Sequence, residues 1–285
     1  MRVPAKRSST SFRAVAALAG TLLLATLTAC GGSSDKDSGS GGSDVPFSTI
    51  SAGELTVGVP TFPPFSSLEN GRIVGPDGDV VYKIAEKYGL KVVAKPYEFS
   101  ALIPAVRQKR IDIAIGSIFR TKERAKVIDF TDPIYIEPGS IISKSGISTV
   151  DELKGKKVGT VQGYNWVEDI DKVLNGKLKQ YPSSVELKQD LEAGRIEAGL
   201  DSYGTSLHLY KGTGFTVKTL EPDPQVAAAT TPGQVAFVLP KNDKDLKDGL
   251  DAVIATLHED GGIAAALKKA GLDPDKAETG KPSYL

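Results

Sequence analysis

Residues 110–116 read RIDIAIG, and residues 195–201 read RIEAGLD. The two stretches agree in residue type at every position except the last, and each is an apolar run short enough to be a buried strand. One repeat is weak support for an internal duplication, but it predicts two similar lobes in which Gly116 and Asp201 lie at equivalent strand ends. Because ligands of open α/β sheets collect beyond the carboxyl ends of the strands, two such lobes would enclose a cleft.

Before residue 117, segments with a strand pattern alternate with segments with a helix pattern. In order, they are a strand at 55–59, a helix at 79–88 that ends at Gly89, a strand at 91–94, a helix capped by Ser100 with Pro104 in its first turn, and a strand at 111–115. This β-α-β-α-β series is typical of a parallel sheet covered by helices.

The pattern restarts after residue 148, where capping boxes of the form S/T-x-x-E occur at 149–152 and 183–186. Further strands are expected at 157–161, 195–200, 215–220 and 234–239, and further helices at 166–174, 205–210, 243–259 and 263–270. The helix at 243–259 needs a sheet to pack on, and we assign it to the first lobe. The chain would then cross between lobes twice, near 134–138 and 230–234, so that lobe 1 comprises 49–138 and 231–285 and lobe 2 comprises 139–230.

The N-terminal segment has the layout of a secretory signal peptide. Four basic residues and no acidic one accompany an apolar run at 14–27, which is shorter than the roughly 20 residues of a transmembrane helix. The run ends in a lipobox, Leu27-Thr28-Ala29-Cys30, and Cys30 is the only cysteine of the chain. We therefore expect a signal peptide at 1–29, lipidation of Cys30 and a flexible Gly/Ser-rich tether over 30–48. The protein would be anchored on the outer face of the cytoplasmic membrane, extracellular or periplasmic; an uncleaved anchor helix is the alternative.

Composition excludes several classes of function. The chain has 35 basic and 35 acidic residues, and removing a signal that holds four basic ones leaves 31 basic against 35 acidic, a net charge of −4. No basic patch is visible in the sequence, so nucleic acid is not an expected partner. Since His208 and His258 are the only histidines, a Cys/His metal site or nucleophile is excluded, and we expect no metal and no cofactor.

A series of short motifs occurs in one order along residues 53–271. They are VG at 57–58, FPPF at 62–65, GPDGD at 75–79, LIPA at 102–105, TKER at 121–124, IDFTDP at 128–133, DELKGKKVG at 151–159 and GRIEA at 194–198. This series resembles the polar amino-acid family (family 3) of periplasmic and extracellular solute-binding proteins, the receptors of ABC importers, in its lipoprotein form.

The resemblance implies an α/β fold with two Rossmann-like lobes joined by a two-stranded hinge, the type II periplasmic binding protein or Venus-flytrap architecture. It also implies a monomer that is not an enzyme, has no catalytic residues, captures an amino acid or similar zwitterion between its lobes, and delivers it to ABC permease subunits.

The resemblance further implies which residues would bind the ligand. Arg124 matches the arginine that takes the ligand α-carboxylate, for which a planar guanidinium is suited. Asp201 matches the carboxylate that takes the α-amino group. Phe62 and Phe99 match an aromatic pair that flanks the ligand side chain, and Ser117 matches a position whose backbone contacts the ligand.

Some positions depart from the family pattern. Phe119 stands where the family usually has threonine, and residues 164–166 read Tyr164-Asn165-Trp166 where a small residue is common. The cleft therefore gains aromatic surface and loses hydroxyl groups, although Tyr164 could restore one hydroxyl, and Asn165 with the amides at the start of the next helix could hold an anion. An aromatic cage around Asp201 would also suit an alkylated or bulky ammonium group. For Trp166, packing within lobe 2 is an equal alternative.

Two other functions use the same fold. A ligand-presenting sensory receptor would have the same site, and gene neighbourhood rather than sequence separates it from a transport protein. An enzyme similar to cyclohexadienyl dehydratase would need a general acid or base in the cleft, for which Asp201 and Glu137 are the only obvious carboxylates.

Overall fold

The computed structural model describes residues 45–230 and 233–285. The expected signal peptide, Cys30, most of the tether, and two residues of the second lobe crossing lie outside the described residues. Within the described ranges, none of the helices has the length and apolar character needed to cross a membrane.

The first sheet has five strands in the order β4-β1-β5-β14-β6. Their bounds are β1 (Glu54–Val59), β4 (Lys91–Pro96), β5 (Ile113–Ala114), β6 (Asp129–Phe130) and β14 (Val238–Leu239). β1 is parallel to β4 and β5, whereas β14 is antiparallel to β5 and β6. A hairpin of β2 (Ser67–Glu69) and β3 (Arg72–Val74) precedes the first helix.

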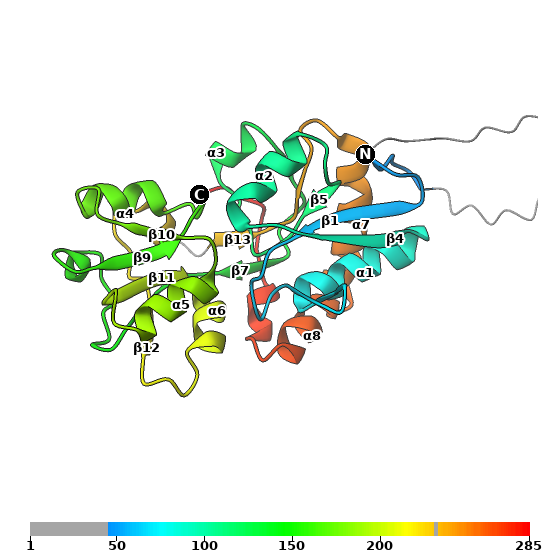
Figure 1. The fold of residues 1–285 in the computed structure, drawn as a ribbon. Coiled ribbons are helices and arrows are strands. Elements are labelled where there is room, and N and C mark those ends of the chain that lie inside the picture. Colours follow the sequence, from blue (N-terminus) through cyan, green and yellow to red (C-terminus); the bar gives the residue numbers. More distant parts are fainter. Residues whose placement is uncertain (1–44, 231–232) are drawn as a thin grey trace, which may run out of the picture. The chain divides into compact units, whose positions relative to one another are not determined.

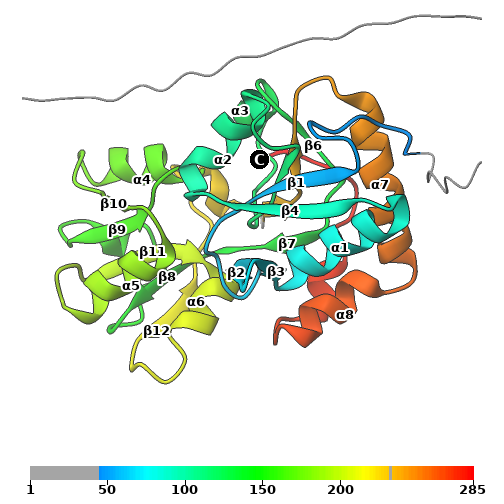
Figure 2. The same cartoon turned by 45° about the vertical axis from the view of Figure 1, so that its right-hand side comes forward.

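Four helices accompany this sheet, together with the single turn α3 (Lys122–Ala125). They are α1 (Pro76–Tyr88), α2 (Phe99–Arg107), α7 (Lys244–Glu259) and α8 (Gly262–Lys269). Helices α7 and α8 pack against α1, so segments from opposite ends of the sequence lie side by side (Figure 2). As the sequence indicates, α1 buries one apolar face and ends at Gly89, which adopts a left-handed conformation with φ 63°.

The second sheet has five strands in the order β10-β9-β11-β8-β12. Their bounds are β8 (Gly139–Ser143), β9 (Val158–Val161), β10 (Lys179–Tyr181), β11 (Ala198–Ser202) and β12 (Thr216–Thr219). β10, β9 and β11 are parallel neighbours, and β8 runs antiparallel to β11 and β12. Its helices are α4 (Val167–Val173), α5 (Ser184–Glu192) and α6 (Tyr203–Leu209).

Two short antiparallel strands connect the sheets. β7 (Tyr135–Glu137) pairs with β13 (Gly233–Val235), and each continues directly into a sheet, β7 into β8 and β13 into β14 (Figure 1). The predicted α/β fold with two lobes and a two-stranded hinge is therefore confirmed.

Several local predictions are wrong. The strand expected at 234–239 is divided into β13 and β14, because its first half pairs with β7 and its second half with the first sheet. Ser100 is not a cap: α2 begins at Phe99 after Glu98, and Pro104 lies inside the helix. Strand β8 was not predicted. The capping box at 149–152 does form, since the Thr149 and Glu152 side chains each accept the other's backbone N–H. At 183–186 the box is incomplete: Ser183 caps α5 by accepting the N–H of Val185, and its hydroxyl rather than its backbone N–H donates to Glu186.

Candidate functional site

One pocket is lined by residues that follow strands of both sheets. Its lining residues are Phe62, Phe99, Ser117, Phe119 and Arg124 from the first lobe and Tyr164, Asn165, Trp166 and Ser202 from the second. Eight of the nine residues predicted as ligand-binding are thus brought together. The ninth, Asp201, does not line the pocket but contacts the lining residues Tyr164 and Ser202. Ser202 was not predicted, although it follows Asp201 at the same strand end.

Arg124 is positioned by the short turn α3. The hydroxyl of Thr121 caps this turn by accepting the Arg124 backbone N–H at 3.1 Å. The guanidinium donates through Nη1 to the carbonyl of Phe119 and through Nη2 to the carbonyl of Gly163, both at 2.9 Å. Burial lowers the pKa of Arg124 to about 10, so the group stays cationic at neutral pH. The side chain therefore joins the two lobes across the pocket.

Asp201 is fully buried near the end of β11. Its Oδ1 accepts the hydroxyl of Tyr164 at 3.0 Å and the backbone N–H of Ser202 at 2.7 Å. Its Oδ2 has no hydrogen-bond partner among the described residues. Burial raises the pKa of Asp201 to about 6. The carboxylate thus has no counter-ion among the described residues, which is costly for a buried charge.

The aromatic side chains form a continuous series around the pocket. Tyr164 stands at its centre, with ring centroids 4.9 Å from Phe99, 5.0 Å from Trp166 and 6.3 Å from Phe62, each in an edge-to-face arrangement. Phe119 meets Trp166 edge to face at 6.1 Å. Trp166 also donates through Nε1 to Thr160 in β9 at 2.9 Å, so it both packs in lobe 2 and lines the pocket.

These side chains leave almost no free space. The pocket has a volume of about 10 Å³, which is room for about one water molecule. An amino acid can therefore be accommodated only if the lobes separate or if Tyr164 and its neighbours move.

Ser117 is held by a residue that the sequence reasoning did not assign. Asp77, the second residue of α1, accepts the N–H of Gly116 at 3.0 Å and that of Ser117 at 3.4 Å, and the hydroxyl of Tyr135 in the hinge at 2.8 Å. Burial raises the pKa of Asp77 to about 6. The amide of Ser117 is thus engaged within lobe 1, although Ser117 still lines the pocket. In the sequence, the position of Asp77 directly after Pro76 at a helix start was the signal that could have pointed to this residue.

Comparison with known proteins identifies the family. The profile of bacterial extracellular solute-binding proteins, family 3, matches residues 55–272. The chain belongs to this family.

Several amino-acid-binding proteins resemble the chain over most of their length. The L-cystine-binding protein TcyJ of Escherichia coli (strain K12) is 30% identical over 224 residues, which cover 76% of this chain and 82% of TcyJ. The L-arginine-binding protein of Pseudomonas aeruginosa is 30% identical over 216 residues, 70% of this chain and 80% of that protein. The solved structure of an ancestral arginine-binding protein bound to arginine has a TM-score of 0.68 and 30% identity, covering 76% of this chain and 97% of that one.

Glu137, the other carboxylate considered for acid–base chemistry, lies in the hinge of this family-3 chain and does not line the pocket. One oxygen accepts Lys276 Nζ at 2.8 Å, and the other accepts the backbone N–H of Gly204 at the start of α6. Glu137 thus ties the hinge to the C-terminal segment and to lobe 2. The relatives reported above are binding proteins rather than enzymes.

Proposed function

We propose that this chain captures an amino acid, or a closely related zwitterion, between its two lobes and presents it to the permease of an ABC importer. In this proposal Arg124 binds the ligand carboxylate and Asp201 binds the ammonium group, while Phe62 and Phe99 flank the side chain. Membership of family 3 and the amino-acid-binding relatives support the function. The residue roles rest on the geometry of the pocket.

The observation that carries the proposal is the buried carboxylate of Asp201, which has no counter-ion among the described residues. A buried carboxylate without a counter-ion destabilises the unliganded protein, and an ammonium group would supply the missing charge. Arg124 lines the same pocket but belongs to the first lobe, so its positive charge can bind the carboxylate end of a zwitterion.

Ligand binding must exchange internal contacts for ligand contacts. In the unliganded protein, the Tyr164 hydroxyl donates to one oxygen of Asp201, and the Arg124 guanidinium donates to two backbone carbonyl groups. A ligand that carries both an ammonium and a carboxylate replaces these contacts with charged partners, which form stronger hydrogen bonds. The two-stranded hinge allows the lobes to separate for this exchange.

A thermal-shift screen of amino acids, opines, betaines and polyamines tests the function. A ligand at 100 times its dissociation constant stabilises the protein by about 2.7 kcal/mol, and we expect such a shift from at least one amino acid. Stabilisation by betaines alone would instead favour a binder of alkylated ammonium groups, which the aromatic series around Asp201 would suit. No shift with any zwitterion would contradict the proposal.

We also propose that Cys30 anchors the protein to the membrane through lipid, on the strength of the lipobox and the tether sequence. Wild type and Cys30→Ser should be expressed in a bacterial host and fractionated. We expect wild type in the membrane pellet and the variant in the soluble fraction; equal membrane association of both would contradict the anchor.

A further inference from the structure

The amino-terminal edge of the second sheet carries a large pocket. Because β10, β9 and β11 are parallel neighbours, the three loops that lead into them meet at one edge. A pocket of about 780 Å³ opens there, lined from segments 154–158, 172–179 and 195–196 and by Gln225. The ligand cleft lies at the opposite, carboxyl edge. The four residues of β9 separate the two by roughly 13 Å of strand, so the pocket is not part of the cleft.

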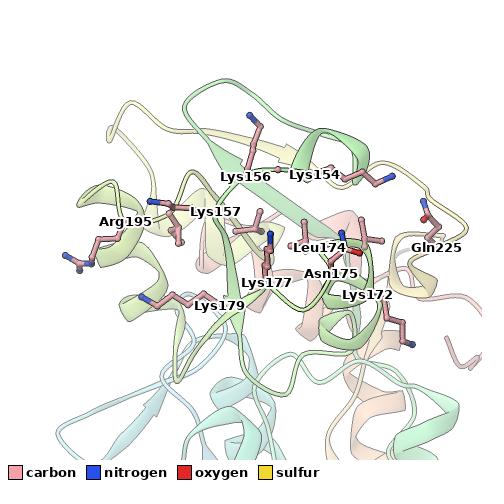
Figure 3. A pocket seen from close by; sticks show the side chains of 14 residues that line it. Lys154, Lys156, Lys157, Lys172, Leu174, Asn175, Lys177, Lys179, Arg195 and Gln225 are labelled. Atoms are coloured by element: carbon pink, nitrogen blue, oxygen red, sulfur yellow. The ribbon is translucent and has the colours of Figure 1, made fainter.

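The lining of this pocket is strongly basic. Six lysines and Arg195 line it, and no acidic residue does among those described. Figure 3 shows the labelled basic side chains on both sides of the pocket, with Lys179 and Arg195 on the left and Lys154 and Lys172 on the right. The sequence showed no basic patch, because the cations come from three segments separated by strands and helices. The sheet brings them together.

Nearby carboxylates balance only part of this charge. Asp151 and Asp169 each pair with one lining lysine, and Asp190 pairs with a lysine and with Arg195. Glu197 and Asp171 accept backbone N–H groups of the loops. The four paired cations have side chains that are 52–73% exposed. The pairs of Lys154 and Lys172 are mostly exposed and contribute little to stability, so an incoming anion can replace them readily. The side chain of Asp190 is only 10% exposed, so Lys179 and Arg195 remain paired with it.

Three of the lining lysines have no ion-pair partner anywhere in the described ranges. They are Lys156, Lys157 and Lys177. Lys156 and Lys157 lie in the loop before β9, and Lys177 lies in the neighbouring loop before β10. Three free ammonium groups around one concave site present nine N–H donors and no acceptor. Such a donor set is suited to one anion that carries several negatively charged oxygens.

We propose that this pocket binds a phosphate-bearing group. Phosphoryl oxygens accept strong charge-assisted hydrogen bonds from ammonium groups, and the volume of the pocket is in the range of small-molecule sites. The group is either a free oligophosphate or a phosphate-bearing headgroup that projects from an anionic membrane. The proposal is independent of the function of the cleft, because the two sites lie at opposite edges of the sheet.

The test uses the full chain with Cys30→Ser, so that lipid attachment does not itself bring the protein to vesicles. Calorimetry measures the binding of sodium tripolyphosphate, and co-sedimentation measures binding to phosphatidylglycerol vesicles and to neutral phosphatidylcholine vesicles. The test variant combines Lys156→Gln, Lys157→Gln and Lys177→Gln. The control removes the same charge from three exposed lysines elsewhere, with Lys87→Gln, Lys211→Gln and Lys268→Gln.

We expect saturable binding of one tripolyphosphate per chain, weakened about tenfold or more in the test variant and unchanged in the control. A free oligophosphate is then the ligand. Binding only to phosphatidylglycerol vesicles, lost in the test variant alone, would assign the lipid headgroup as its source. The proposal is overturned if neither probe binds, or if both variants lose binding equally, since that would show a response to net charge. Both variants should retain binding of any cleft ligand, which verifies that they are folded.

Discussion

Asp201 carries a buried carboxylate whose ionisation lowers the stability of the unliganded protein. Burial raises its pKa from 3.8 to about 6. At pH values between these two, the folded protein therefore still holds a proton that the unfolded chain has lost. The stabilising effect of this proton is complete below about pH 4 and is lost as the pH rises through 6. Above that pH, the charged form lowers the free energy of unfolding by roughly 3 kcal/mol.

We therefore predict that Asp201→Asn is more stable than wild type at pH 8 and about equally stable near pH 4. The asparagine Oδ1 can still accept the N–H of Ser202 and the hydroxyl of Tyr164, while the buried charge is gone. Urea denaturation at both values checks this. If Asp201→Asn is destabilised by the same amount at pH 4 and at pH 8, the carboxylate stabilises the folded protein and the prediction is wrong.

Gly163 of lobe 2 lies close to the backbone of lobe 1. It has φ +84°, and a Cβ placed there would lie 3.0 Å from Cα of Ser100 at the start of α2. We predict that Gly163→Ala separates the lobes, breaks the bond from Arg124 to the Gly163 carbonyl, and increases the radius of gyration of the unliganded protein in small-angle scattering.

Gly176→Ala is the matched control for this substitution. Gly176 has a similar φ of +76° but no atom within 4 Å of an added Cβ. Both variants should lose about 1 kcal/mol of stability from the left-handed backbone conformation. Only Gly163→Ala should change the scattering; the same radius for both would mean that this contact does not hold the lobes together.

At the scale of elements, the hinge strand β7 depends on the segment after α8. Glu137 has no exposed side-chain surface, and its partner Lys276 is 15% exposed. Removing one member of a buried ion pair costs about 3–5 kcal/mol, because the other charge is left uncompensated. We predict a loss of this size in the free energy of unfolding for Lys276→Met.

The exposed Lys281→Met should leave stability unchanged and serves as the control. Adding Glu137→Gln to Lys276→Met should recover part of the loss, since glutamine removes the unpaired charge and can still accept the N–H of Gly204. Urea denaturation of the four proteins decides this. If the double variant is no better than Lys276→Met, the loss comes from packing rather than from charge.

The elements show what sequence patterns can and cannot predict. Some local signals were reliable: Ser183 caps α5 and Gly89 ends α1, whereas Ser100 does not cap α2. The division of residues 234–239 into β13 and β14 was not predictable from periodicity, because both halves are apolar and differ only in the strand with which they pair. The caps are set by neighbours in sequence, whereas strand pairing is set by the tertiary fold.

For the whole molecule, the repeat of RIDIAIG and RIEAGLD pointed to two lobes. The strands within these stretches, β5 and β11, do lie in different sheets. The repeat also indicated that Asp201 lies at a strand end. It could not reveal that the Tyr164 hydroxyl would donate to Asp201, which lies 37 positions further along lobe 2, or that Arg124 of lobe 1 would donate to the carbonyl of Gly163 in lobe 2. The basic pocket was missed for a related reason, because its lysines are clustered by the sheet and not by the sequence.

The central claim is that Arg124 and Asp201 bind opposite ends of one zwitterion. Calorimetry with the best ligand from the thermal-shift screen, on wild type, Arg124→Ala and Asp201→Ala, tests it most directly. Loss of one partner of a buried charge pair costs about 2–5 kcal/mol, so each variant should bind at least about 30-fold more weakly than wild type. Wild-type affinity in both variants would contradict the account.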